Sequence, residues 1–170
     1  MKNDLNKQLN SYIKNFAKLL DNYKSDLPGH IADKIKYLIR NDIEKNMGSA
    51  HGRYNGIGTG LFDGGSEHWV ELAPKTIKNY EYLGYKGDWL RPTLERSGDL
   101  IHSINVNYRN NLTFEITANT PYAEIHQKGG GNIPARPYIV IQDSTKKQIE
   151  NLIEEGFNEY IKTHQKELYS

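Results

Sequence analysis

The chain contains no cysteine, and this absence excludes several kinds of chemistry at once. Without thiols there is no disulfide framework, no cysteine nucleophile and no cysteine-based metal site. A chain free of cysteine is compatible with a reducing cytoplasm. We therefore look for function in surfaces and in other side chains.

Long hydrophobic runs are also missing from the sequence. No window approaches the roughly 18 consecutive apolar residues that a membrane span requires. The first residues, Met1 to Asp4, lack an apolar run, so we expect no secretory signal. The sequence therefore predicts a chain that does not contact a membrane.

The sequence shows no excess of one charge sign, since 22 basic and 21 acidic residues leave a net charge of +1. A near-neutral balance gives no electrostatic argument for binding nucleic acid or a membrane surface. The 170 residues have the length of one domain, and 36% of them are hydrophobic. We expect a single domain with a modest core and solvated helices.

Two amphipathic stripes open the chain. Between residues 4 and 24, apolar side chains recur at three- and four-residue steps, which predicts a helix. A break at residues 25–29 includes Pro28, which is tolerated near a helix start. A second stripe then runs to Met47. Two adjacent helices joined by a short turn predict a helical hairpin over residues 1–47.

A glycine-rich stretch follows, with seven glycines between residues 48 and 66. Ordering so many glycines costs conformational entropy, so we expect a mobile loop over residues 48–68 that becomes ordered on contact with a partner. Its few apolar side chains, Ile57, Leu61 and Phe62, could anchor it there. We expect the same behaviour at the tip formed by residues 129–131.

Residues 69–170 predict a mixed core that ends in a long helix. Helical spacing marks residues 73–82, and Ser97 predicts the N-cap of a short helix through Ser103. Alternating patterns over 104–108 and 112–118, joined at Asn110-Asn111, predict a hairpin. A helical turn at 122–127, a third strand at 136–141 and a helix at 144–164 complete an α+β fold with a small antiparallel sheet.

Four short blocks occur in order within about 70 residues. They are Trp69-x-x-Leu72 with Pro74 and Thr76, then Leu94-x-x-Ser97-Gly98-x-Leu100 with Ser103-Ile104, then Tyr122-Ala123-x-x-His126-Gln127 before a glycine run, and Pro134-Ala135-Arg136-Pro137-Tyr138. Their order and spacing resemble the phage virion morphogenesis family, the Mu-like tail completion proteins. The resemblance covers roughly residues 69–165.

The resemblance implies a structural protein at the head–tail junction of a tailed phage or a phage-derived particle. Such a protein completes the tail or neck so that head and tail can join. The implied partners are other phage neck or tail proteins and further copies of the chain in a homo-oligomeric ring. The implied location is the virion, after assembly in the host cytoplasm. No catalysis and no cofactor are implied.

Three residues of these blocks are expected to act as anchors, that is, to fix the fold or an interface. Trp69 precedes a helix and is expected to fill the edge of the core or to contact a partner. Gly98 is expected to allow a sharp turn or a close approach between segments. His126 is expected to be hydrogen-bonded at the mouth of the glycine loop.

The last block centres on Arg136. Pro137 biases Arg136 toward an extended backbone, so its guanidinium can reach sideways to a carboxylate or to backbone carbonyls. This arrangement predicts that Arg136 bonds to groups within its own chain and so acts as an internal lock. A salt bridge to another subunit is the alternative. Tyr122 and Tyr138 are expected to stack nearby.

Metal and hydrolase sites find little support in the pattern. The six histidines form no H-x-x-x-H pair, so no metal site is predicted. Ser97, Asp99 and His102 are the residue types of a hydrolase triad, but the sequence around Ser97 lacks the G-x-S-x-G motif of a nucleophile elbow. A small hydrolase using His102 or His126 is therefore the least favoured of the alternatives.

A module that contacts DNA at the neck is the stronger alternative. Basic and aromatic residues interleave between positions 75 and 96, which allows stacking together with charge. Nearby acidic residues (Glu81, Asp88 and Glu95) weaken the case. The members of this stretch are Lys75, Lys78, Tyr80, Tyr82, Tyr85, Lys86, Trp89, Arg91 and Arg96.

Overall fold

The structure is a computed structural model that describes residues 2–47, 73–84, 94 and 97–169. The predicted loop at 48–68 and the anchor Trp69 lie outside the described residues. So do Tyr85, Lys86, Trp89, Arg91 and Arg96 of the basic and aromatic stretch.

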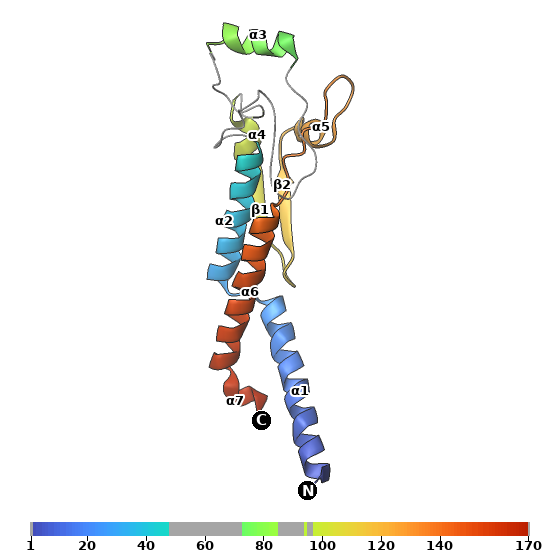
Figure 1. The fold of residues 1–170 in the computed structure, drawn as a ribbon, viewed down its shortest axis with the longest axis vertical. Coiled ribbons are helices and arrows are strands. Elements are labelled where there is room, and N and C mark those ends of the chain that lie inside the picture. The colour runs from blue at the N-terminus through green and yellow to red at the C-terminus, as the bar shows by residue number, and fades with distance from the viewer. Residues whose placement is uncertain (1, 48–72, 85–93, 95–96, 170) are drawn as a thin grey trace. The chain divides into compact units, whose positions relative to one another are not determined.

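Over the residues that the structure describes, the fold is mainly helical with one small antiparallel sheet of two strands, which confirms the α+β prediction (Figure 1). No helix in the described part of the chain is long and apolar enough to cross a membrane. The elements are α1 (Lys2–Ser25), α2 (Gly29–Asn46), α3 (Pro74–Tyr82), α4 (Asp99–His102), β1 (Ile104–Tyr108), β2 (Phe114–Ala118), α5 (Ala123–Lys128), α6 (Asp143–Thr163) and α7 (Gln165–Leu168).

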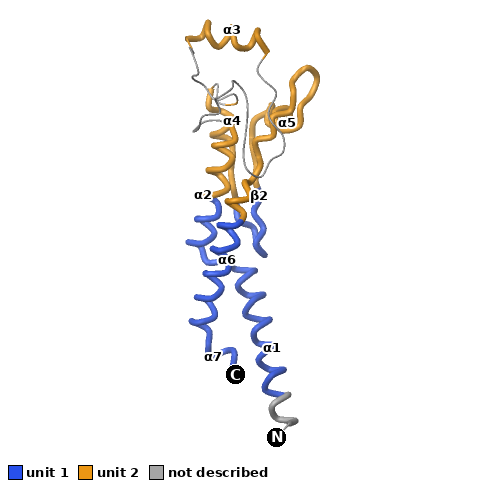
Figure 2. The backbone as a smooth tube through the Cα atoms, in the orientation of Figure 1, with its two compact units in different colours: residues 1–36, 107–115, 147–170 blue, residues 37–106, 116–146 orange. Residues whose placement is uncertain are grey.

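The chain divides into two compact units (Figure 2). Unit 1 contains residues 1–36, 107–115 and 147–170, and unit 2 contains residues 37–106 and 116–146. Helices α2 and α6 and the β1–β2 hairpin contribute residues to both units. The organisation of the chain as a single domain with an N-terminal helical hairpin stays a prediction, although helices α1 and α2 themselves are confirmed.

Unit 1 is built on aromatic contacts between α1 and α6. The ring of Phe157 lies 5.7 Å from that of Phe16 and 5.3 Å from that of Tyr23, measured between centroids. The Tyr23 hydroxyl donates a hydrogen bond to the carbonyl of Ile153 at 3.2 Å. Burial raises the pKa of this hydroxyl, so it stays protonated and can remain a donor.

The hairpin turn lies one residue later than the sequence predicts. Asn111 and Leu112 are its central residues, with φ angles of 46° and 58°, and Thr113 N donates to Asn110 O at 2.7 Å. Positive φ at both central positions is the geometry that matches the twist of paired strands. Leu112, predicted within the strand, therefore belongs to the turn, and β2 begins at Phe114.

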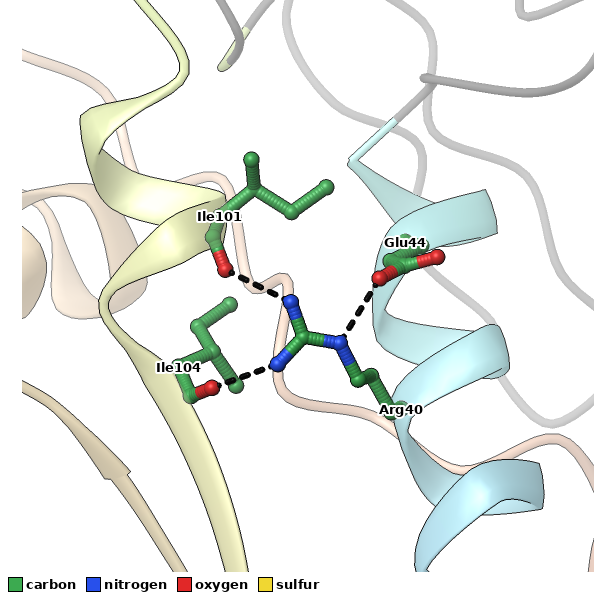
Figure 3. A network of polar contacts seen from close by, with 4 residues as sticks. All are labelled: Arg40, Glu44, Ile101 and Ile104. Atoms are coloured by element: carbon green, nitrogen blue, oxygen red, sulfur yellow. Dashed lines mark hydrogen bonds and ion pairs between the residues drawn. The ribbon is translucent and has the colours of Figure 1, made fainter.

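The core of unit 2 combines α2, α4 and the segments that follow. Its buried side chains include Ile39, Ile43, Met47, Leu94, Leu100, Ile101, Ile104, Ala123 and Tyr138. Arg40 links two of these elements (Figure 3). Its guanidinium donates to the carbonyls of Ile104 at 2.7 Å and Ile101 at 3.3 Å, while Nε pairs with Glu44 at 2.9 Å. The carbonyl of Ile101 lies in the last turn of α4, where helix carbonyls lack intrahelical partners.

The predicted third strand at 136–141 is wrong, because this segment forms no strand in the structure. Pro134 and Pro137 have no N–H and cannot complete a ladder. The backbone groups between them are held in other ways. Arg136 N donates to His126 O at 2.7 Å, and Asn46 Nδ2 donates to Pro137 O at 2.7 Å.

Side chains from other elements bind further backbone groups in and just after this segment. Gln127 Oε1 accepts hydrogen bonds from Tyr138 N at 3.0 Å and from Ile139 N at 3.1 Å. The buried carboxylate of Asp42 accepts from Gln142 N at 2.8 Å and from its side-chain amide at 3.1 Å. An extended segment is thus anchored without belonging to a sheet.

Candidate functional site: a cleft where the sequence blocks meet

Unit 2 contains a cleft of about 980 Å³, walled by α3, the segment around α4, and α5. Three of the four sequence blocks contribute to it. The lining residues are Lys75, Thr76, Asn79, Tyr80, Leu83, Leu94, Ser97, Asp99, Leu100, Tyr122 and His126.

Helix α3 forms one wall and buries none of its residues. Pro74 stands at its first position, where the missing N–H costs nothing. Helix α3 ends where Leu83 N donates to Asn79 O at 3.0 Å. A helix with no buried residue has side chains available for a ligand or partner, and Lys75, Thr76 and Asn79 offer it donors and acceptors.

The second wall depends on Gly98, which precedes α4. Its φ is 82°, in the left-handed region, and a Cβ there would lie 3.0 Å from Cε1 of His102. The positive φ therefore favours glycine at this position, and a Cβ would also crowd the ring of His102. Gly98 also occupies the N-cap position predicted for Ser97, so that prediction is wrong by one residue. The Ser97 hydroxyl instead donates to the Asp99 carboxylate at 2.7 Å.

His126 lies on the third wall and is half-buried. Burial, and secondarily the positive charge of Arg136, lowers the pKa of its imidazole and favours the neutral form. Its ring meets that of Tyr122 edge-on at 5.7 Å. The carbonyl of His126 accepts from Arg136 N, but Nδ1 of the ring has no hydrogen-bond partner among the described residues.

The fourth block lies directly behind His126. Arg136 is buried, with 6% of its surface exposed, and Tyr138 is buried at 1%. Burial lowers the pKa of Arg136, and nearby Tyr80 acts in the opposite direction. The Tyr138 hydroxyl donates to Ala123 O at 3.3 Å, while Tyr122 remains 37% exposed at the cleft. The role of Arg136 as an internal lock, rather than an intersubunit partner, stays a prediction.

The structure thus places most of the predicted anchor residues in or beside one cleft. Tyr122 and His126 line the cleft, Gly98 lies between two lining residues, and the backbone of Arg136 is bonded to His126. Pro137 and Tyr138 follow that contact. Asn79 and Leu83 belong to none of the four sequence blocks, although the three-residue steps from Ile77 to Tyr80 and Leu83 mark this face of α3.

The side chains of Ser97, Asp99 and His102 make contacts other than those of a hydrolase triad. Ser97 donates to Asp99, and the ring of His102 lies against the backbone of Gly98, so these residues do not form a nucleophile–base pair. Within the described ranges, no group of three or more His, Asp or Glu side chains gathers as metal ligands would. The arrangement offers apolar contact and hydrogen bonding to a partner.

Comparisons with known proteins agree with the resemblance of the blocks. Residues 71–158, slightly more than half of the chain, match the phage virion morphogenesis family. All residues that line the cleft lie within this range. Neither a comparison with curated proteins nor a comparison with solved structures found a match. The chain therefore belongs to the phage virion morphogenesis family, whose members have structural roles in building phage particles.

Proposed function

We propose that this protein completes the tail or neck of a tailed phage and mediates the joining of head and tail. It acts as a homo-oligomeric ring, it contacts other neck or tail proteins, and it is part of the virion after assembly in the host cytoplasm. Membership of the phage virion morphogenesis family supports the structural role. A ring offers the same surface to a tubular neighbour all round its axis.

One observation carries the proposal: three separated sequence blocks converge on a single cleft. The blocks that characterise the resemblance therefore build a surface as well as a fold. Leu83 at this surface is 44% exposed and Tyr122 is 37% exposed. On α5 and in the loop after it, Ile125 and Ile133 are 39% and 43% exposed. Exposed apolar and aromatic side chains beside a concave surface are typical of protein interfaces.

We infer that the cleft receives a segment of a neighbouring virion protein. The polar side chains of α3, including Thr76 and Asn79, can hydrogen-bond to the backbone of such a segment. Tyr122 combines a large apolar surface with a hydroxyl, a combination enriched where interfaces are most sensitive to substitution. Because the imidazole of His126 is neutral, it offers no positive charge to pair with. We therefore infer that the part of the partner that contacts this wall carries no negative charge.

The experiment is a particle-assembly assay with and without the protein. A phage or prophage lacking it should produce heads and tails that remain separate in negative-stain electron micrographs, and supplying the wild-type protein should restore joined particles. Tyr122→Ala should reduce the joined fraction at least about tenfold, the scale expected for losing an interface hot spot.

A matched control uses another exposed tyrosine of this unit. Tyr82 is 88% exposed and does not line the cleft, so Tyr82→Ala should restore joining as the wild-type protein does. Normal joined particles in the absence of the protein would refute the proposed function. Equal joining by the two tyrosine variants would refute the cleft as the docking surface.

A further inference from the structure

The ring of His126 has one nitrogen left for a molecule in the cleft. The residue lines the cleft, but its Nδ1 is buried and has no hydrogen-bond partner among the described residues. Nε2 is the only other polar atom of the side chain. Any hydrogen bond between this side chain and a bound molecule therefore involves Nε2.

The burial of Nδ1 also indicates which nitrogen carries the proton. Burial and the positive charge of Arg136 lower the pKa of the imidazole, and the neutral ring that results has a single N–H. A proton on Nδ1 would be a buried donor without an acceptor, and orphaned N–H groups are rarer in proteins than orphaned acceptors. The proton therefore belongs on Nε2, where it can be donated to a molecule in the cleft.

Helix α5 presents this donor within an uncharged arc. At 3.6 residues per turn, Ile125, Tyr122 and His126 fall within about 100° of the helix circumference. The two charged residues of α5, Glu124 and Lys128, lie outside this arc and pair with each other at 2.8 Å. The arc therefore offers aliphatic, aromatic and imidazole surface without a charge.

The loop after α5 adds a further apolar side chain to this surface. The backbones of Gly130 and Ile133 pair in both directions, with hydrogen bonds of 3.0 Å each. A Cβ at Gly130 would lie 3.9 Å from Cγ1 of Ile125. Ile125 and Ile133 are thus both neighbours of Gly130, and both are exposed. Apolar side chains beside a binding surface favour a partner segment that is poor in charged residues.

The cleft has no net charge to offer such a segment. Among the lining residues that the structure describes, Lys75 is basic, Asp99 is acidic and His126 is neutral. The carboxylate of Asp99 already accepts a hydrogen bond from the Ser97 hydroxyl at 2.7 Å. A charged side chain of either sign would therefore lose water in the cleft without full compensation, which costs free energy.

We propose that the cleft binds an uncharged, non-helical segment of the neighbouring virion protein, and that His126 donates from Nε2 to a main-chain carbonyl of that segment. Carbonyls inside a helix already accept from N–H groups four residues further on, so a non-helical segment is the one that offers free carbonyls. Thr76 and Asn79 on α3 provide side-chain acceptors for its N–H groups. This inference rests on the proposed function and specifies the chemistry of the partner segment.

The first test measures the position of the proton in the purified chain. Long-range correlation of ¹⁵N and ¹H nuclei in the histidine rings distinguishes a protonated from an unprotonated ring nitrogen. The His126 signals are those missing from the spectrum of the His126→Gln variant. At neutral pH we expect a proton on Nε2 and none on Nδ1. A proton on Nδ1 would overturn the proposal, whatever the protein does in the particle.

The second test compares His126→Gln with His126→Met. Purified protein is added to separate heads and tails from a lysate that lacks it, and joined particles are counted by electron microscopy. The two substituted side chains have the same length, but only glutamine has an N–H donor. The protein concentration for half-maximal joining should be at least about tenfold higher for the methionine variant, which leaves the partner's carbonyl unpaired. Equal concentrations would show that His126 donates no such bond.

The third test asks whether the segment is uncharged. Leu83 lines the cleft and is 44% exposed. Leu83→Glu and Leu83→Lys remove the same apolar contact and differ only in the sign of the new charge. Both should raise the concentration for half-maximal joining, and by similar factors. Joining that improves with one sign, or that depends strongly on the sign, would identify a charged segment and overturn the proposal.

Circular dichroism shows whether each variant keeps its helices. If His126→Met does not fold, the proton position in the wild-type chain and the Leu83 pair still decide the matter. Heads and tails that join without the protein would refute the proposed function, and this inference with it. Joining that requires the protein but proceeds equally well with glutamine and methionine at position 126 would overturn this inference alone.

Discussion

Gly156 shows how a single residue sets the packing of unit 1. It lies within α6, where glycine normally costs about 1 kcal/mol relative to alanine. A Cβ at this position would overlap the Cδ1 atom of Ile31 and the hydroxyl of Tyr23. The missing side chain is thus what allows α1 and α2 residues to approach α6 this closely.

We expect Gly156→Ala to destabilise the chain despite its better helix propensity. Forcing a methyl group into a filled space costs about 1–3 kcal/mol in the free energy of unfolding, and we expect this cost to exceed the gain in helix propensity of about 1 kcal/mol. Urea denaturation followed by circular dichroism measures the difference. Gly29→Ala is the matched control, because nothing lies within 4 Å of a Cβ there. An alanine variant at position 156 more stable than that control would contradict the packing argument.

His126 leads to a prediction about pH. Burial and the charge of Arg136 lower its pKa in the folded chain, so the unfolded chain binds this proton more readily. The stability linked to the neutral ring is therefore complete above the ordinary histidine pKa of about 6.5 and is lost as pH falls below it toward the folded value.

His126→Asn should flatten this dependence, because asparagine is neutral throughout. Urea midpoints measured from about pH 7.5 down to about pH 5 should fall less for the variant than for the wild-type chain. Parallel curves for the two proteins would show that His126 does not carry the effect.

At the scale of elements, α5 and the extended segment after it replace the predicted third strand. Two prolines prevent this segment from completing a ladder, and Gln127 of α5 provides the acceptor that a neighbouring strand would otherwise provide. Gly129 allows the chain to double back, since a Cβ there would lie 2.9 Å from Ala135 N. A local pattern of alternating residues could not reveal this arrangement.

Gln127→Ala should destabilise unit 2 by about 1–3 kcal/mol, because it leaves the N–H groups of Tyr138 and Ile139 without their acceptor. Gln127→Glu keeps an acceptor oxygen at the same reach and should lose less. Chemical denaturation of the two variants beside the wild-type chain gives the comparison. If glutamate proves as costly as alanine, the paired hydrogen bonds are not what holds the segment.

At the scale of the whole molecule, charge balance argues against DNA as the main partner. The net charge is +1, and the described members of the basic and aromatic stretch lie on α3, where Lys75 lines the cleft. We expect little binding to duplex DNA in a filter-binding assay across a salt series. Contact with several phosphates would produce affinity that falls steeply with salt, and such a result would favour the DNA-contacting alternative.

Much of the fold was predictable because its elements are encoded locally. The stripes of α1, α2 and α6 recur at helical spacing within each segment, and Asn110-Asn111 marked the hairpin to within one residue. The errors occur where local signals compete: Ser97 is a good N-cap residue, yet Gly98 takes that position. The cleft itself was not predictable, because its walls come from residues as far apart in sequence as Lys75 and His126.

The sequence alone determined the helices, the hairpin and the order of the blocks that place the chain in its family. Each of these depends on periodicity or on residue types within a short stretch, which a neighbouring segment does not alter. Only the tertiary structure decided that residues 136–141 would not pair as a strand, that the blocks would line one cleft and that Arg136 would be buried behind His126. Those outcomes depend on hydrogen bonds and burial between segments distant in the chain, whose free energies no local pattern contains.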